Sequence, residues 1–327
     1  MSDLLPPNWL DWDLQALAQL APVQWLNWPL MDQLQLKVGI KREDLLHAQL
    51  GGNKLYKLHG HLRSAVAQGH QQVLSFGGAW SNHIYALAAA GQMLGMRTTG
   101  VIRGEAPPVP SAMLQDVTAM GMQLHFISRS DYNRKHEPEF LHELRQHLGL
   151  FYAIPEGGGD GLGAEGCRAL GNGLTTIRPH EPYDVVCCAV GTGGTLAGLA
   201  AGLPLSVNIC GFSVLKGADQ LREDVADRLL ELGGPHASWQ LETEYHCGGY
   251  ARCPDRLAQF MQEFELQTGV RLDPVYTGKM MWGIAHKAIA GEWPAHTRIL
   301  ALHSGGLQGR RGFPGIADLS RKAPNGW

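Results

Sequence analysis

The hydrophobic residues of this chain follow two alternating patterns, which predict strands and helices in turn. Continuous apolar runs of about four to eight residues are typical of strands that are buried on both faces of a sheet. Longer stretches in which apolar residues recur with the helical period predict helices with one buried face. The predicted strands are 72–76, 98–103, 123–127, 150–154, 184–190, 207–214 and 298–302. The predicted helices are 53–68, 85–94, 111–120, 137–148, 163–177, 217–232, 254–268 and 279–290, with another that starts at residue 196.

The alternation of strand and helix predicts an α/β fold with two lobes. Strands that are joined through helices run parallel, and the helices then cover both faces of the sheet. The pattern therefore predicts a three-layer αβα arrangement with mostly parallel sheets. We expect a large domain formed by residues 1–50 and 160–327, a small α/β domain formed by residues 51–159, and a glycine-lined crevice between them.

The N-terminal segment, residues 1–36, has neither pattern and is expected to be irregular. It contains the tryptophans Trp9, Trp12, Trp25 and Trp28. Because a tryptophan carries a large apolar ring, this segment is expected to pack across another part of the fold.

Composition and charge exclude several classes of function. A net charge of −3 and a pI near 6.6 give no electrostatic reason to expect nucleic acid or a membrane as a partner. No apolar run approaches the roughly 18 residues that span a bilayer, and the N-terminus lacks the pattern of a signal peptide. We therefore expect a cytoplasmic protein. The 42 glycines are nearly double the average share of about 7%, and their clusters predict binding loops built from backbone.

The cysteines and histidines do not predict a metal centre. The six cysteines form no C-x-x-C pair, and Cys187 and Cys188 lie inside an apolar run, so free thiols in a reducing cytosol are expected. Two pairs of closely spaced histidines, at 59 and 61 and at 136 and 142, have no third partner at the spacing of metal ligands.

Gly191–Thr195 lies between a predicted buried strand and a predicted helix. Backbone N–H groups at such a helix start, together with the hydroxyls of Thr192 and Thr195, can bind a phosphate ester. The segment is neither a dinucleotide fingerprint, because Leu196 occupies the third glycine place, nor a P-loop, because it lacks the Lys-Ser/Thr ending. A tight turn that needs glycines for steric reasons is the equal alternative.

Two further segments place polar groups at helix starts. A short strand-like run around Ile40 leads through a polar turn to Gly51-Gly52-Asn53-Lys54, in which Asn53 is expected to be the N-cap. Alone, Lys54 would more often be a surface residue in a salt bridge. Ser81-Asn82-His83 precedes the next helix, whose free N–H groups suit a carboxylate. Ordinary N-capping accounts for Ser81 or Asn82 but does not require both.

Six motifs occur in an order that resembles a known family. They are Gly52-Asn53-Lys54 with Lys57, Ser81-Asn82, Glu156-Gly157-Gly158, Gly191–Thr195, Asp273-Pro274-Val275-Tyr276-Thr277-Gly278-Lys279 and His303-Ser304-Gly305-Gly306. This order is similar to that of the 1-aminocyclopropane-1-carboxylate (ACC) deaminase / D-cysteine desulfhydrase family of pyridoxal-phosphate (PLP) enzymes. The resemblance covers roughly residues 40 to 306, and it implies the tryptophan-synthase-β-like architecture, or PLP fold type II. It also implies a homodimer.

The resemblance implies a cofactor role for one set of residues. Lys54 would bind PLP covalently and then move the Cα proton of the substrate. Asn82 would hydrogen-bond the hydroxyl of the pyridoxal ring. The residues implied for the phosphate are Lys57, Gly191, Thr192, Gly193, Gly194 and Thr195.

The resemblance implies a second set of residues for the substrate. Ser81, with the amides of Asn82 and His83, would bind the substrate carboxylate. Tyr276 matches a tyrosine beside the reacting centre, and Tyr250 matches a second one although the residues that follow it depart from the family pattern.

Two positions bear on the reaction. Deaminase-type members of the family carry a glutamate and an apolar residue where this chain has Thr277 and Ser304. A neutral hydroxyl cannot hold a pyridine nitrogen protonated as a carboxylate can, because only the carboxylate adds an opposite charge. A PLP ring whose nitrogen is not protonated withdraws electrons less strongly. This disfavours the opening of a cyclopropane ring more than the loss of a thiolate from Cβ.

Four functions remain open at this point. The first is α,β-elimination from a small D-amino acid, with D-cysteine giving pyruvate, ammonia and sulfide. The second is deamination of ACC to 2-oxobutanoate and ammonia. The third is a PLP-dependent racemase of the same fold, for which Ser81 or Tyr250 would be the second proton donor. The fourth is a non-enzymatic protein that binds a phosphorylated metabolite at Gly191–Thr195.

Overall fold

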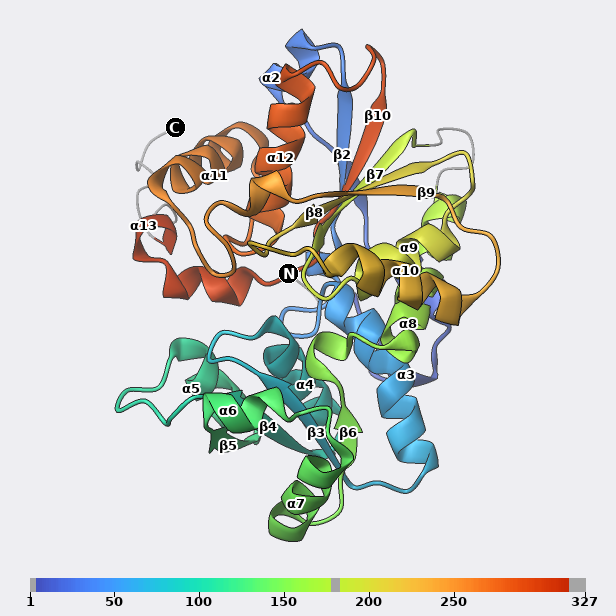
Figure 1. The fold of residues 1–327 in the computed structure, drawn as a ribbon. Helices are drawn as coiled ribbons and strands as arrows, with labels where there is room; N and C mark the ends of the chain where they lie inside the picture. The colour runs from blue at the N-terminus through green and yellow to red at the C-terminus, as the bar shows by residue number, and fades with distance from the viewer. Residues whose placement is uncertain (1–3, 178–182, 318–327) are drawn as a thin grey trace.

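Two sheets, each with helices on both faces, organise the chain (Figure 1). A computed structural model describes residues 4–177 and 183–317. The larger sheet has six strands in the order β1-β2-β10-β7-β8-β9, and the smaller has four in the order β5-β4-β3-β6. Neighbouring strands are parallel, except that β1 runs antiparallel to β2. The strands are β1 Val23–Trp25, β2 Lys37–Lys41, β3 Gln72–Gly77, β4 Arg97–Arg103, β5 Gln123–Ile127, β6 Tyr152–Ile154, β7 Val185–Val190, β8 Asn208–Ser213, β9 Ser238–Glu242 and β10 Arg298–Leu302.

The helices connect these strands. They are α1 Leu14–Leu20, α2 Pro29–Gln33, α3 Asn53–Ala67, α4 Asn82–Leu94, α5 Ala112–Ala119, α6 Arg129–Asn133, α7 Pro138–Leu148, α8 Gly161–Ile177, α9 Gly194–Gly202, α10 Leu221–Leu232, α11 Asp255–Thr268, α12 Thr277–Ile289 and α13 Pro314–Ala317. The 3-10 helices are η1 Trp9–Asp11, η2 Glu43–Leu45, η3 Glu156–Gly158, η4 Glu244–His246 and η5 Leu307–Gly312. Within residues 4–177 and 183–317, no helix combines the length and the apolarity that a membrane span requires.

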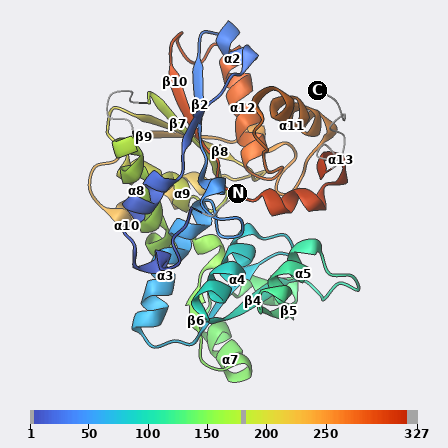
Figure 2. The same ribbon diagram turned by 180° about the vertical axis from the view of Figure 1, so that it is seen from behind.

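Alternate residues of the central strand β7 face two different cores, which defines three layers. Val186 and Cys188 join a cluster formed with α8 and α9, whereas Val185 and Cys187 join a cluster formed with α11 and α12. These helix pairs lie on opposite sides of the larger sheet (Figure 1, Figure 2). The smaller sheet is layered in the same way between α4 and α5 on one face and α6 and α7 on the other. The predicted α/β fold of two three-layer lobes with mostly parallel sheets is confirmed.

The two sheets occupy separate parts of the sequence. Residues 72–154 form the smaller sheet, and residues 23–41 together with 185–302 form the larger one. Helix α3, which we assigned to the small domain, contacts α8 and η1 as well as α4 and η3. The domain boundaries at residues 50 and 160 therefore stay a prediction.

The expectation of an irregular N-terminal segment was wrong. It holds η1, α1, β1 and α2, and Asp13 caps α1 by accepting hydrogen bonds from the N–H groups of Gln15 and Ala16 at 2.9 and 3.1 Å. These elements are too short to produce a periodic pattern, and contacts such as that of α1 with α8 stabilise them. The expected burial of the tryptophans holds for Trp9 and Trp28, whereas Trp12 is exposed.

The larger sheet also has two edge strands that the pattern did not predict. β1 and β9 are edge strands of three and five residues with partly exposed side chains. An edge strand buries too few side chains to leave a continuous apolar run in the sequence.

Other glycines of the chain serve helix packing, a role that our interpretation of the glycine content did not include. A Cβ on Gly198 of α9 would lie 2.4 Å from the carbonyl oxygen of Ala164 in α8. A Cβ on Gly166 of α8 would lie 1.9 Å from the carbonyl oxygen of Tyr56 in α3. Because glycine has no Cβ, α8 can approach α9 and α3 closely enough for backbones to touch.

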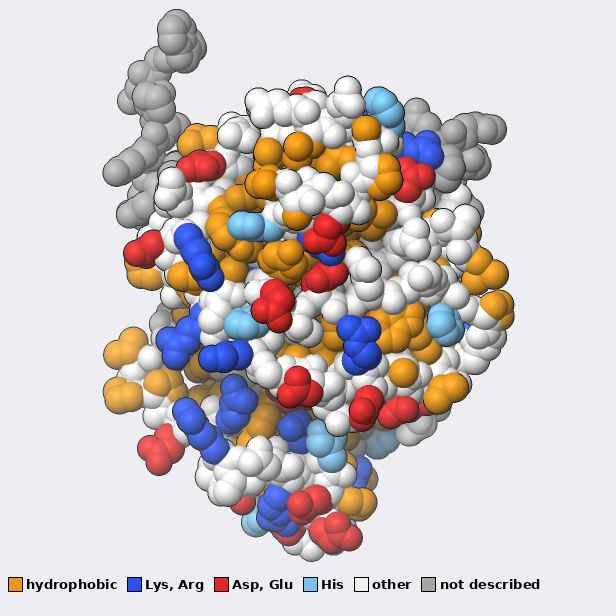
Figure 3. Space-filling view, turned by 45° about the horizontal axis from the view of Figure 1, so that its top comes forward, with side chains coloured by type: hydrophobic (Ala, Val, Ile, Leu, Met, Phe, Trp, Pro, Cys, Tyr) orange, Lys and Arg blue, Asp and Glu red, His pale blue; other side chains and the backbone are white. Residues whose placement is uncertain are grey.

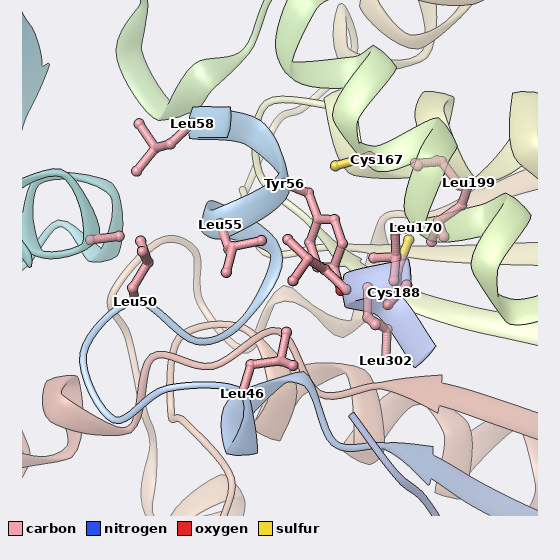
Figure 4. Close-up of a cluster of buried hydrophobic side chains, with 14 of the residues drawn as sticks. Leu46, Leu50, Leu55, Tyr56, Leu58, Cys167, Leu170, Cys188, Leu199 and Leu302 are labelled. Carbon is pink, nitrogen blue, oxygen red and sulfur yellow. The ribbon is translucent and has the colours of Figure 1, made fainter. Parts of the chain in front are cut away.

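The first turn of α3 is held in a buried apolar cluster (Figure 4). Leu55 and Tyr56 pack with Leu46 and Leu50 of the preceding loop, and Cys167 of α8 belongs to the same cluster. The Tyr56 hydroxyl donates a hydrogen bond of 2.7 Å to Glu43, whose carboxylate lies 3.3 Å from the Lys41 ammonium. The start of α3 is therefore fixed by this packing.

We expect Gly166→Ala to destabilise the protein, because the added Cβ forces α8 away from Tyr56. Overpacking of this kind typically costs about 1–3 kcal/mol, which thermal unfolding should register as a lower melting temperature. The control is Gly315→Ala in α13, whose Cβ would meet no atom within 4 Å. The control should stay within about 0.5 kcal/mol of the parent. Equal melting temperatures for the two variants would contradict the close contact.

Candidate active site

A pocket of about 830 Å³ follows the carboxyl ends of β3, β4, β7 and β10, and residues of both lobes line it. Parallel α/β sheets bind ligands at this edge, because loops of variable sequence and the starts of helices meet there. Lys54, Ser81, Thr192 and Tyr276 all line this pocket, although they lie far apart in the sequence.

The start of α9 presents backbone N–H groups to the pocket, an arrangement that can bind an anion. Gly193 is its N-cap with a φ of 80°, and the N–H groups of the next residues have no partner inside the helix. A Cβ on Gly194 would come within 3.3 Å of the Lys57 ammonium, so only glycine leaves this space open. Lys57 is buried, which lowers its pKa, and its ammonium lies 3.4 Å from the Thr192 hydroxyl.

The expected cap of α3 differs from the observed one. Gly52, with a φ of 100°, is the N-cap, and a Cβ there would lie 2.2 Å from the carbonyl oxygen of Ser304. Asn53 instead donates a hydrogen bond of 2.8 Å from its amide to the Thr195 hydroxyl. The prediction that Asn53 caps the helix was therefore wrong, and its side chain ties α3 to the start of α9.

Lys54 lies on the pocket wall beside the start of α9. Its ammonium is 3.3 Å from the carbonyl oxygen of Gly157, which accepts the hydrogen bond. Burial and, to a lesser extent, the neighbouring Lys57 charge together lower the pKa of Lys54 to about 7. A large fraction of this amine is therefore uncharged near neutral pH, as a nucleophile or base must be.

The start of α4 lines another part of the pocket. Ser81 is the N-cap, and its hydroxyl accepts a hydrogen bond of 3.3 Å from the N–H of Ile84. The N–H groups of Asn82 and His83 have no partner within the helix. The Asn82 side-chain oxygen accepts a hydrogen bond of 2.6 Å from Gln308 of η5.

His83 lines the pocket as a buried, neutral side chain. Burial lowers its pKa well below the usual range, and the charges of Lys54 and Lys57 act in the same direction. Its Nε2 lies 2.8 Å from the hydroxyl of Ser75, which itself donates to the carbonyl oxygen of Ile154. We therefore assign the proton to Nε2. This leaves Nδ1 as a buried acceptor without a hydrogen-bond partner among the described residues.

Tyr250 and Tyr276 stand together at the pocket. Their ring centroids are 6.2 Å apart at an angle of 76°, and Tyr276 also contacts the position where Gly191 would carry a Cβ. Burial raises the pKa of both phenols, so both are protonated at neutral pH. Tyr250 is 43% exposed, although it lines the pocket.

Ser304 lines the pocket, whereas Thr277 does not, which corrects the pairing that we expected. Asp273 accepts hydrogen bonds from the N–H groups of Val275, Tyr276 and Thr277. The Thr277 hydroxyl in turn accepts a hydrogen bond of 2.7 Å from the N–H of Asp273, and the side chain is fully buried. This turn places the Tyr276 side chain on the pocket wall and the Thr277 side chain in the protein interior.

Several pocket residues were missed in the sequence. Trp80, Arg103, Arg129 and Arg252 line the pocket, as does Glu156, which we had noted only as part of a glycine motif. Arg103 could have been found, because it is the last residue of a parallel strand and so lies at the ligand-binding edge. The same signal applies to Arg129, which lies two residues after the end of the parallel strand β5, whereas Arg252 lies on an irregular loop and carries no such signal. Tyr56, between Lys54 and Lys57 in the sequence, is buried in the core and does not line the pocket.

Comparisons with known proteins agree with this geometry. The family model described as "Pyridoxal-phosphate dependent enzyme" matches residues 20–305. The bifunctional D-cysteine desulfhydrase/1-aminocyclopropane-1-carboxylate deaminase of Arabidopsis thaliana is 30% identical over 292 residues, which cover 83% of this chain and 72% of that protein. The D-cysteine desulfhydrase of Serratia proteamaculans is 28% identical over 294 residues, which cover 84% and 88%.

A solved structure shares the fold over nearly its whole length. The crystal structure of an ACC deaminase homologue superposes with a TM-score of 0.80 and 26% identity, covering 96% of this chain and 94% of the other. The family match, the fold and the named relatives lead to one assignment. This chain belongs to the family of pyridoxal-phosphate dependent enzymes, among relatives named as ACC deaminases and D-cysteine desulfhydrases.

Proposed function

We propose that this PLP-dependent enzyme catalyses α,β-elimination from a small D-amino acid, such as D-cysteine. The net reaction converts D-cysteine and water to pyruvate, ammonia and hydrogen sulfide. The observation that carries the proposal is the position of Lys54 on the wall of one pocket that also holds two anion-binding helix starts, those of α4 and α9. That arrangement suits an amino acid whose amine and Cα meet Lys54.

The pocket residues fit PLP. The glycines of Gly191–Thr195 leave a space at the start of α9 that a Cβ would fill, and Lys57 supplies a positive charge beside it. These groups would hold the phosphate, with the Thr192 and Thr195 hydroxyls as further donors. Bound PLP supplies an electron sink for the pair of electrons that is left when a bond to Cα breaks.

Lys54 would hold the cofactor covalently and afterwards act as the base that removes the Cα proton. Both tasks need an uncharged amine, and the lowered pKa of about 7 provides it near neutral pH. The carbonyl oxygen of Gly157, at 3.3 Å, orients the amine.

The start of α4 would bind the substrate carboxylate. Ser81 and the N–H groups of Asn82 and His83 are the donors, and the helix dipole favours the negative charge. Because His83 is neutral, it adds no charge, and its free Nδ1 can accept a hydrogen bond from the bound ligand. Asn82 would hydrogen-bond the hydroxyl of the cofactor ring.

The choice between elimination and ring opening rests on Ser304. It lines the pocket with a neutral hydroxyl, and Thr277, which we had placed beside it, is buried behind Asp273. A hydroxyl partner for the pyridine nitrogen favours loss of a thiolate over the opening of a cyclopropane ring. ACC deamination is the second candidate, because the Arabidopsis relative carries both names. Racemisation, with Ser81 or Tyr250 as the second acid, is the third.

We further propose a cytoplasmic homodimer with the active site between a large domain, residues 1–50 and 160–327, and a small domain, residues 51–159. The dimer rests on the family resemblance. The described cysteines are all free, which suits a reducing compartment. Tyr276 and Tyr250 would stand beside the reacting centre, where their protonated hydroxyls can donate to a leaving group.

We expect Lys54→Ala to abolish the visible absorption of covalently held PLP and to lower turnover by more than about 10³-fold. Absorption spectra of the purified holoenzyme and an assay for 2-oxo acid measure the two effects. The control, Lys37→Ala, removes a lysine of β2 that is not part of the pocket wall. This variant should keep both the visible absorption and the turnover of the parent. Retained turnover in Lys54→Ala would contradict the assigned role.

The capture of PLP should depend on pH through Lys54. Only the neutral amine attacks the aldehyde, so capture by the apoprotein should accelerate as pH rises through about 7 and level off above it. The usual lysine pKa of 10.5 would place the rise far higher. Stopped-flow absorption measures the rate, with N-acetyl-lysine amide as the reference amine. A midpoint near that of the reference would show that the site does not lower the pKa.

We expect turnover of D-cysteine to exceed that of ACC by more than about tenfold in kcat/KM, measured as 2-oxo acid released. Ser304→Glu should shift this ratio toward ACC, because a carboxylate raises the pKa of the pyridine nitrogen. Thr277→Glu, by contrast, should destabilise the fold, since it buries an unpaired charge. Faster turnover of ACC than of D-cysteine by the parent enzyme would reverse the order of the two candidates.

A further inference from the structure

The pocket wall has more basic side chains than are needed to bind the cofactor and the α-carboxylate of the substrate. Its charged lining residues are Lys54, Lys57, Arg103, Arg129, Arg252 and Glu156. In the proposed function Lys57 serves the phosphate, Lys54 is bonded to the cofactor, and backbone N–H groups of α4 serve the substrate carboxylate. The proposed function assigns no ligand group to the three arginines.

Glu156 does not neutralise the arginines. Its carboxylate accepts a hydrogen bond of 2.7 Å from the Tyr132 hydroxyl and lies 3.5 Å from the Lys135 ammonium. In the described part of the chain, Arg103, Arg129 and Arg252 form no ion pair. Elsewhere Arg134, Arg168 and Arg228 are paired with glutamates. The guanidinium groups of the pocket therefore remain available to a ligand.

The arginines come from both sides of the pocket. Arg103 ends β4 in the smaller lobe, with its guanidinium 5.5 Å from the centre of the Tyr132 ring and near Gly78, which precedes the cap of α4. Arg129 is the first residue of α6. Arg252 follows Tyr250 on a loop of the larger lobe. Basic side chains also gather on the left of the space-filling view, around a hollow between the upper and lower parts of the molecule (Figure 3).

From this arrangement we infer that the substrate carries a second anionic group, on the substituent that leaves from Cβ, and that Arg103, Arg129 and Arg252 bind it. Arginine suits this role because its guanidinium is always charged and offers paired donors to a carboxylate, sulfonate or phosphate. All three side chains line the pocket and are exposed, so an anionic group of a ligand can reach them.

The inference rests on the proposed elimination and deepens it. The Cα proton passes to Lys54, and the bond from Cβ to the substituent breaks with its electron pair on the leaving atom. Water then releases ammonia from the three-carbon product to give pyruvate. S-carboxymethylcysteine would thus yield pyruvate, ammonia and thioglycolate. Binding of the anion by the arginines would hold the leaving group and stabilise the charge that it gains.

The test compares a matched pair of substrates, S-carboxymethylcysteine and its amide S-carbamoylmethylcysteine, each as the D and the L enantiomer. The two have the same shape and leaving sulfur, and only one carries the second charge. We expect the holoenzyme to prefer the carboxylate by about tenfold or more in kcat/KM, as a hydrogen-bonded charge pair commonly provides. Arg103→Gln and Arg252→Gln should each lower this ratio.

The control variant is Arg97→Gln. Arg97 begins the same strand that Arg103 ends, so the control removes the same charge from the far end of the sheet and should keep the parent ratio. A parent ratio of one or below, or an equal ratio in the Arg103→Gln variant and the control, would overturn the inference.

A binding measurement separates this inference from the proposed function. 3-(Carboxymethylthio)propanoic acid and its carbamoylmethyl analogue lack the amine and cannot react, so calorimetry with the holoenzyme reports recognition alone. Tighter binding of the diacid, weakened in Arg103→Gln, would support the anion site even if no amino acid is eliminated. Elimination of D-cysteine without any preference for the diacid would leave the proposed function standing and overturn the anion site.

Discussion

The contact between α3 and α8 is the constraint on which the site depends. The Tyr56 carbonyl lies where Gly166 would carry a Cβ, and the Tyr56 ring reaches back to the Glu43 carboxylate. Tyr56 follows Lys54 by two positions on the same helix. Because neither neighbour can move without a clash or an unpaired buried charge, the amine of Lys54 is held in one place.

The same packing sets the electrostatics of the pocket. Lys54 and Lys57 lie one turn apart on α3, and burial lowers the pKa of both. Two helix starts add partial positive charge, and three arginines of the pocket lining add full charges. A site of this kind attracts a ligand with several negative groups, such as a phosphorylated cofactor together with an anionic amino acid.

Hydrogen bonds to the backbone decide which of two adjacent side chains meets the ligand. Asp273 accepts hydrogen bonds from the N–H groups of Tyr276 and Thr277 at the start of α12, and the Thr277 hydroxyl accepts one from the N–H of Asp273. Tyr276 is therefore left facing the pocket while Thr277 is buried. Ser304, on the loop after β10, also lines the pocket, and its hydroxyl is the neutral group that we propose as the partner of the cofactor ring.

The two-lobed α/β fold and the order of the glycine motifs could be predicted from the sequence, because strand and helix periods are local properties of the chain. The sequence also predicted that Lys54 and Gly191–Thr195 belong to a site, because their motifs combine a helix start with backbone donors. The rest needed the tertiary structure. The partner of Asn53, the burial of Thr277 and the close helix contacts at Gly166 involve residues brought together by packing. Arg103, Arg129 and Arg252 share no motif, and only the meeting of the two lobes places them around one pocket.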